Sequence, residues 1–121
     1  ESTRHFVNAE TIAKMKDGVT IINCARGELM NIPDMIRGIE TQKIGALALD
    51  VFDKEDGIYH ENRRDDILSN RDMAYLRQFP NVIMTQHMAF YTDAAVQSMV
   101  FCGIEGLCDF ARTGHTATEL V

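Results

Sequence analysis

Three side chains of complementary chemistry each stand shortly after an apolar, strand-like run: Arg26, Glu55 and His87. A guanidinium binds a carboxylate through two parallel hydrogen bonds and carries a permanent charge. An imidazole can act as a general acid near neutral pH. A carboxylate beside it, here Glu55, can accept a hydrogen bond from the ring and fix its orientation. Together these three groups could bind a 2-oxo acid and protonate its carbonyl oxygen.

The elements that would position these groups alternate between apolar runs and amphipathic segments. The predicted strands are residues 19–22, 44–49 and 82–84. The predicted helices are one capped by Asn8 and ended by Gly18, one capped by Asn31, a short one over 73–77, and a long one over 92–112 ended by Gly114. The charged stretch 53–72 has no apolar periodicity, and we expect it to run over the surface.

This order predicts an α/β fold with a parallel sheet covered by helices, because the strand-like runs are apolar throughout rather than alternating. In such sheets, ligands bind beyond the carboxyl ends of the strands. Arg26, Asp50 and His87 all lie at or just past those ends. Each alone has a common structural explanation, such as a surface ion pair, and only the shared location favours a catalytic site.

Bulk composition restricts the class of protein. The chain has 121 residues, 45% of them hydrophobic, which suits one core and is short for two. A net charge of −6 argues against nucleic acid or an anionic membrane as a partner. No apolar run approaches the ~20 residues of a membrane span, and the first residues do not form a signal peptide. The chain begins without Met, which fits a piece of a longer protein.

Three cysteines, Cys24, Cys102 and Cys108, form no C-x-x-C pair. An odd number of cysteines in this pattern indicates reduced thiols in a cytoplasmic protein. Cys24 stands close to Arg26 and could be reactive, but a small residue that fills a tight strand end is the favoured explanation. No serine lies in a G-x-S-x-G elbow and no histidine pair has metal-ligand spacing, so neither a serine hydrolase nor a metal site is expected.

Three segments resemble the D-isomer-specific 2-hydroxyacid dehydrogenase family, and within it the D-lactate dehydrogenases. The segment MKDGVTIINCARGELM, residues 15–30, looks like the family's strand and arginine signature. The segment KIGALALDVF, residues 43–52, resembles the next strand, and QHMAFYT, residues 86–92, resembles the histidine turn. The resemblance covers nearly the whole chain and implies the second half of a Rossmann-type NAD-binding domain.

The resemblance also implies roles for individual residues. Arg26 would bind the substrate carboxylate, His87 would donate the proton, and Glu55 would be the carboxylate partner of His87. The cofactor NAD would contact Arg26 and four further residues: Thr3, Cys24, Ala25 and Asp50, with Asp50 beside the nicotinamide carboxamide. The substrate side chain would lie near Phe90 and Tyr91, although core packing explains these two aromatics equally well.

Some positions depart from the family pattern. Asn31 stands where Asp is usual, which exchanges one helix cap for another. Gln86 stands where Pro commonly precedes the histidine, which leaves the backbone before His87 less restricted. Asp53 is shorter than the Glu often found there, and the spacing from Asp50 favours Glu55 as the partner of His87.

The family's separate substrate domain, its G-x-G-x-x-G turn and the acidic residue that binds the ribose are not found in this sequence. We therefore expect residues 1–91 to form the C-terminal half of an NAD-binding domain. Residues 92–121 would form a long helix and a tail that cross back to the missing substrate domain. The apolar stripe of that helix would then lack a partner, which predicts self-association or an exposed patch.

Two hypotheses remain for the function. The first is a fragment of a cytoplasmic oxidoreductase that reduces a 2-oxo acid, pyruvate or similar, to the D-2-hydroxy acid with NADH. It would be inactive alone and a homodimer at full length, with a small-molecule substrate and no nucleic acid or membrane partner. The alternative is an NADH-responsive, corepressor-like binding module on the same fold. The sequence leaves open which 2-oxo acid is used and whether the cofactor is NAD or NADP.

Overall fold

The computed structural model describes residues 3–53, 55, 58 and 70–118, and most of the surface excursion expected over 53–72 lies outside these residues. The chain divides into two compact units, residues 1–88 and residues 89–121. Each unit is described by itself below. The division expected at residue 91, and the role given to the second part, remain predictions.

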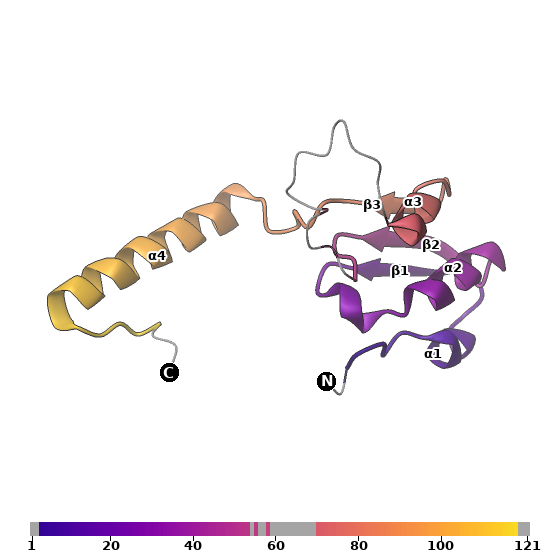
Figure 1. Cartoon of the computed structure of the whole chain (residues 1–121), viewed down its shortest axis with the longest axis horizontal. Coiled ribbons are helices and arrows are strands. Elements are labelled where there is room, and N and C mark those ends of the chain that lie inside the picture. The colour runs from indigo at the N-terminus through magenta and orange to yellow at the C-terminus, as the bar shows by residue number, and fades with distance from the viewer. Residues whose placement is uncertain (1–2, 54, 56–57, 59–69, 119–121) are drawn as a thin grey trace. The chain divides into compact units, whose positions relative to one another are not determined.

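The first unit is built on a three-stranded parallel sheet (Figure 1). Its strands lie in the order β1 (Val19–Asn23), β2 (Ile44–Leu49) and β3 (Val82–Met84). The predicted bounds of β2 and β3 are confirmed, and β1 extends one residue beyond the prediction. The parallel pairing confirms the α/β fold class and brings the carboxyl ends of all three strands to one edge of the sheet.

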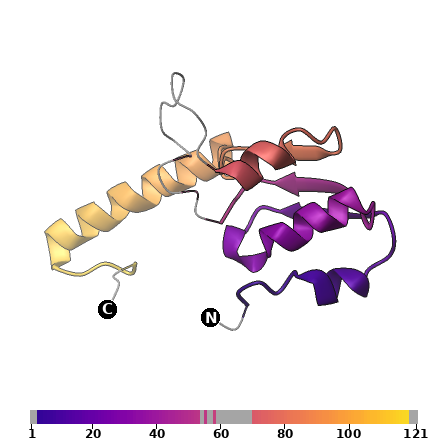
Figure 2. The same cartoon turned by 45° about the vertical axis from the view of Figure 1, so that its right-hand side comes forward.

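Two helices connect the strands and lie over the same face of the sheet (Figures 1 and 2). Helix α2 (Ile32–Glu40) joins β1 to β2, and helix α3 (Arg71–Leu76) precedes β3. Consecutive parallel strands with right-handed crossovers place both connections on one face. The buried core between helices and sheet consists of Ile12, Met30, Ile32, Met35, Ile39, Ile44, Leu47, Leu49, Phe52, Met73 and Leu76.

Helix α2 approaches β2 closely because Gly38 lies at their contact. A side chain on Gly38 would come within 2.5 Å of Ile44 Cδ1. Both Gly38 and Ile44 are buried. The weak helix former at position 38 is therefore explained by packing, because the loss of helix propensity is offset by a close helix–strand contact.

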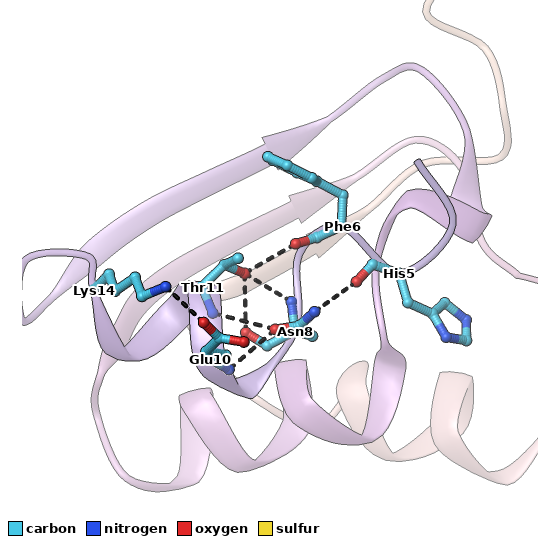
Figure 3. Close-up of polar contacts among 6 residues, drawn as sticks. All are labelled: His5, Phe6, Asn8, Glu10, Thr11 and Lys14. Atoms are coloured by element: carbon cyan, nitrogen blue, oxygen red, sulfur yellow. Dashed lines mark hydrogen bonds and ion pairs between the residues drawn. The ribbon is translucent and has the colours of Figure 1, made fainter. Parts of the chain in front are cut away.

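Helix α1 (Ala9–Ala13) begins with a capping box at Asn8. The Asn8 side chain accepts hydrogen bonds from the amides of Glu10 and Thr11, while Thr11 Oγ1 accepts one from the Asn8 amide (Figure 3). Asn8 Nδ2 also donates to the carbonyl of His5 at 2.9 Å. These contacts satisfy amides that a helix start leaves without partners, and they hold the segment before the helix in place.

The prediction that Gly18 ends this helix is wrong, because α1 ends at Ala13 with Lys14 as its C-cap. Lys43 donates to the carbonyl of Met15 and to Asp17 Oδ1, both at 2.6 Å, and so holds the segment that follows the helix. The hydrogen bond to Lys43 lowers the pKa of the Asp17 carboxyl below its ordinary value. Gly18 adopts φ 72°, which turns the chain into β1.

The expectation that the strands are buried throughout is also wrong, because burial alternates along β1. Ile22, paired with Ala48 in β2, is 68% exposed. Ile83, paired with Ala48 from the other side, is 66% exposed. The helices of this unit cover one face of its sheet, so an apolar strand composition here produces one buried and one open face.

The second unit consists mainly of helix α4 (Asp93–Thr113), close to the predicted bounds. Thr92 caps its start, and Gly114, at φ 77°, caps its end. The expected exposed patch is present, because six large apolar side chains of the helix are more than half exposed: Met99, Val100, Phe101, Ile104, Leu107 and Phe110.

Among the described residues, α4 is also the one helix that is long and apolar enough to cross a membrane, by length and composition only. Glu105 and Asp109 lie within the helix, and carboxylates are costly in lipid. An apolar face prepared for protein contacts explains the same composition.

Candidate active site

The loop that follows β1 is organised by a buried asparagine, Asn23, which is 6% exposed. Its Oδ1 accepts a hydrogen bond from the Ala25 amide at 3.0 Å, and its Nδ2 donates to the Arg26 carbonyl at 2.8 Å. Sequence reasoning did not identify Asn23. The available signal was a polar side chain at the end of an apolar strand, where burial requires hydrogen-bond partners.

Arg26 follows directly in extended backbone conformation, and its side chain is exposed. Its Nη1 donates to the carbonyl of Ala25 at 2.7 Å, which leaves the rest of the guanidinium's donors for a ligand. The guanidinium borders a pocket of about 290 Å³ that is lined by Thr3, Arg4, Arg26, Glu28 and Leu29. The structure thus brings Thr3 and Arg26, both predicted to contact the cofactor, to one pocket.

Gly27 lets the Arg26 loop approach the segment after β2. A Cβ atom at position 27 would lie 2.2 Å from the carbonyl carbon of Phe52 and 2.4 Å from the amide nitrogen of Asp53. Both contacts are with backbone, which cannot rotate away as a side chain can. The absence of a side chain at Gly27 therefore sets the spacing between the arginine loop and the loop that carries Glu55.

We expect Gly27→Ala to lower the free energy of unfolding by more than about 3 kcal/mol, because the methyl group would overlap backbone atoms. Gly103→Ala is the matched control. It lies inside α4, where an added methyl group would meet no atom within 4 Å, and the change should stabilise the helix by about 0.5–1 kcal/mol. Urea unfolding followed by circular dichroism measures both. Equal stabilities for Gly27→Ala and the parent would contradict the close approach of Gly27 to the backbone of Phe52 and Asp53.

Glu55 and His87 contact one another directly. His87 Nδ1 lies 2.5 Å from Glu55 Oε1, and the two side chains are 33% and 24% exposed, His87 being the more exposed. Glu55 Oε2 accepts a further hydrogen bond from the Phe52 amide at 2.9 Å, which fixes the carboxylate. An Nδ1–H held by a carboxylate leaves Nε2 as the ring atom that can exchange a proton with a ligand.

Asp50 lies directly after β2 and is 4% exposed. Its Oδ1 accepts hydrogen bonds from Thr85 Oγ1 at 2.5 Å and from the Met88 amide at 2.8 Å. Its main-chain carbonyl accepts one from the His87 amide at 2.7 Å. The carboxylate predicted to contact the nicotinamide therefore also holds the turn that carries His87.

Cys24 and Ala25 border a second pocket, of about 490 Å³, on the side of the loop next to β1. Cys24 is exposed. The pocket is lined by Val7, Ile21, Ile22, Asn23, Cys24, Ala25, Leu29 and Met30. This largely apolar lining suits the face of an aromatic ring, so the residues present fit a nicotinamide.

Phe90 and Tyr91 belong to the second unit and precede α4. Their rings form an edge-to-face pair with centroids 6.2 Å apart. They are 45% and 68% exposed, so packing among the described residues does not bury them. Their predicted contact with a substrate side chain stays a prediction.

The edge formed by the strand ends thus carries a cation after β1, a carboxylate after β2 and a histidine after β3. Such a set can bind an anionic carboxylate and transfer a proton to an adjacent oxygen. Within the parts of the chain that are described, no three histidine, cysteine or acidic side chains are grouped as metal ligands.

This arrangement is that of an α/β domain with a candidate ligand site at the carboxyl ends of its parallel strands. Residues 1–89 match the NAD-binding domain of the D-isomer specific 2-hydroxyacid dehydrogenases. The chain belongs to this family, whose domain binds NAD.

Individual relatives agree with this assignment. The chain is 44% identical, over 97% of its length, to an aromatic 2-oxoacid reductase of Clostridium sporogenes. A D-lactate dehydrogenase structure from Treponema pallidum superposes with a TM-score of 0.94 at 31% identity, covering 100% of this chain and 37% of that one. The NAD-complexed D-isomer specific 2-hydroxyacid dehydrogenase of Lactobacillus delbrueckii ssp. bulgaricus gives 0.87 at 27% identity, covering 99% and 36%. The chain spans about 35% of the length of the curated relative.

Proposed function

We propose that the protein to which this chain belongs reduces a 2-oxo acid to the D-2-hydroxy acid with NADH, and that this chain carries its proton donor and its carboxylate-binding arginine. The observation that carries the proposal is the contact of 2.5 Å between His87 Nδ1 and Glu55 Oε1. This contact lies at the sheet edge to which β1 delivers Arg26. Family membership supports the same reaction class.

The residues divide the work between binding and proton transfer. Arg26 binds the substrate carboxylate through its guanidinium fork and places the carbonyl for reduction. Glu55 orients the imidazole through Nδ1, so Nε2 of His87 protonates the carbonyl oxygen as the carbon is reduced. NADH, when bound, supplies the hydride. Cys24 and Ala25 would border the nicotinamide, with Thr3 and Asp50 as further cofactor contacts.

The second unit has a different role in this proposal. The exposed apolar face of α4 fits a helix that packs against parts of the full-length protein that this chain does not include. Phe90 and Tyr91, at its start, would lie near the substrate side chain. The 121-residue chain alone would then be inactive, and a cytoplasmic homodimer is the form we propose for the full-length protein.

The relatives support two kinds of 2-oxo acid as the substrate. The 44% identity to an aromatic 2-oxoacid reductase supports a bulky 2-oxo acid, while the D-lactate dehydrogenase structures support pyruvate. Pyruvate, 2-oxoisocaproate and phenylpyruvate share the carboxylate and carbonyl that Arg26 and His87 would bind. They differ only in apolar bulk, which one pocket discriminates by about 10- to 200-fold per methylene.

The test is NADH oxidation by the full-length protein, followed at saturating cofactor with these three acids in parallel. We expect turnover on at least one acid, and the ratio of kcat/KM values ranks the substrates. The 121-residue chain serves as a control that should give none. Absence of turnover on all three acids, with NADH binding intact, would contradict the proposed reductase activity. It would favour the alternative, an NADH-responsive binding module.

A further inference from the structure

His87 has a backbone conformation that is uncommon for residues other than glycine. Its φ of 55° lies in the left-handed region, where the Cβ atom of any residue other than glycine is crowded. A residue remains in such a conformation only when the surrounding structure holds it there. The contact between His87 Nδ1 and Glu55 Oε1 therefore depends on whatever fixes this turn.

The fixing contacts converge on Asp50. Thr85 continues the alignment of β3 with β2, because its amide donates to the Leu49 carbonyl at 2.9 Å. The next bonds, from the His87 amide to the Asp50 carbonyl and from the Met88 amide to Asp50 Oδ1, bracket the left-handed residue on both sides. The Asp50 carboxylate is thus the anchor of the turn.

Thr85 sets the position of that anchor. Its hydroxyl donates to Asp50 Oδ1, the same oxygen that accepts from the Met88 amide. A buried carboxylate needs such donors, and two donors on one oxygen fix its direction more firmly than one. Gln86, which follows Thr85, has no ring to restrict its backbone, so the constraint on this turn comes from hydrogen bonds.

We propose that Thr85 is a positioning residue: its hydroxyl, acting through the Asp50 carboxylate, holds the His87 turn so that the imidazole meets Glu55. This inference rests on the proposed function for its effect on turnover, but its effect on the turn is independent of any activity. In this proposal Thr85 acts through the Asp50 carboxylate and the main chain of the turn, and not on the reacting atoms.

The test compares Thr85→Val, which keeps the shape of the side chain but removes the hydroxyl, with Thr85→Ser, which keeps the hydroxyl. In the full-length protein we expect Thr85→Val to lower kcat by roughly 10- to 100-fold, with a smaller change in the KM for NADH, which Asp50 would also contact. Thr85→Ser should stay within about threefold of the parent, because it retains the donor. Thr20→Val, the same change on the exposed face of β1, is the matched control and should leave kcat unchanged.

A second measurement separates the turn from the reaction. Amide hydrogen exchange at His87 and Met88 should become roughly tenfold faster in Thr85→Val, because a charge-assisted hydrogen bond is loosened. The amide of Leu47, bonded to the Asn81 carbonyl at 3.0 Å in the sheet, should exchange as before. A merely structural defect would instead accelerate all three amides together.

The outcomes are distinct. Unchanged exchange at His87 and Met88 in Thr85→Val overturns the proposal, whatever happens to kcat, as does equal acceleration at Leu47. Faster exchange confined to the turn supports it even if no oxo acid is reduced by the parent, in which case only the proposed function fails. Should Thr85→Val not fold, Thr85→Ala removes the hydroxyl without placing a methyl group beside the carboxylate, and the same criteria apply.

Discussion

Replacing His87 with Gln is expected to lower kcat by on the order of 10²- to 10⁴-fold on the preferred 2-oxo acid, the range that a general acid contributes. Gln is similar in size and can still donate a hydrogen bond, but it cannot release a proton to the carbonyl oxygen. Substrate binding depends mainly on Arg26 in this mechanism. The KM should therefore change much less than kcat, and steady-state NADH oxidation by the full-length protein measures both.

A second histidine provides the control for this change. His115 lies in the exposed segment after α4, and His115→Gln should leave both constants within about twofold of the parent, as surface substitutions away from special features usually do. A His87→Gln variant that retains near-normal kcat would exclude His87 as the proton donor. A loss of NADH affinity in the same variant would instead indicate that the change disturbed the cofactor site.

Prediction of the fold succeeded where local signals and tertiary contacts agree. The bounds of β2 follow from an apolar run between Lys43 and Asp50, and α4 is delimited by a threonine cap and a left-handed glycine. Local signals for α1 suggested a longer helix, but the helix ends at Ala13, and Lys43 donates to the carbonyl of Met15 beyond it. A contact between residues 28 positions apart cannot be inferred from either local segment alone.

The burial of the strands also could not be predicted from their sequence alone. The composition of β1 and β2 indicates two covered faces, but the helices of the first unit cover one. An apolar strand composition indicates that both faces of the strand can be packed against other elements. It does not indicate whether those elements lie in the same unit. Ile22 and Ile83 lie on the face that the described helices of the first unit leave exposed.

Sequence analysis identified some residues of the candidate site and missed others. Arg26, Glu55 and His87 could be selected because charged and titratable groups after apolar strands have recognisable chemistry. Asn23 and Thr85 were missed, because their roles depend on hydrogen bonds to a loop or to a carboxylate whose position the fold defines. Neutral polar side chains that support a site carry little signal in a single sequence.

The second large effect is expected for Arg26→Gln, which removes the permanent charge opposite the substrate carboxylate. We expect kcat/KM to fall by roughly 30- to 3000-fold, equivalent to about 2–5 kcal/mol for an uncompensated charged hydrogen bond. The increase in KM should account for much of this loss, because the carboxylate is bound before and during the reaction. The remaining decrease in kcat reflects poorer placement of the carbonyl.

Arg26→Lys distinguishes charge from geometry in this prediction. Lysine retains the positive charge, but its donors all lie on one nitrogen, so it lacks the planar fork that binds a carboxylate with two parallel bonds. We therefore expect Arg26→Lys to recover only part of the lost kcat/KM. Full recovery would show that charge alone suffices, and near-normal kinetics in Arg26→Gln would place the carboxylate site elsewhere. Arg4, which borders the same pocket, is then the next residue to replace, because it is the other cation that the pocket offers among the described residues.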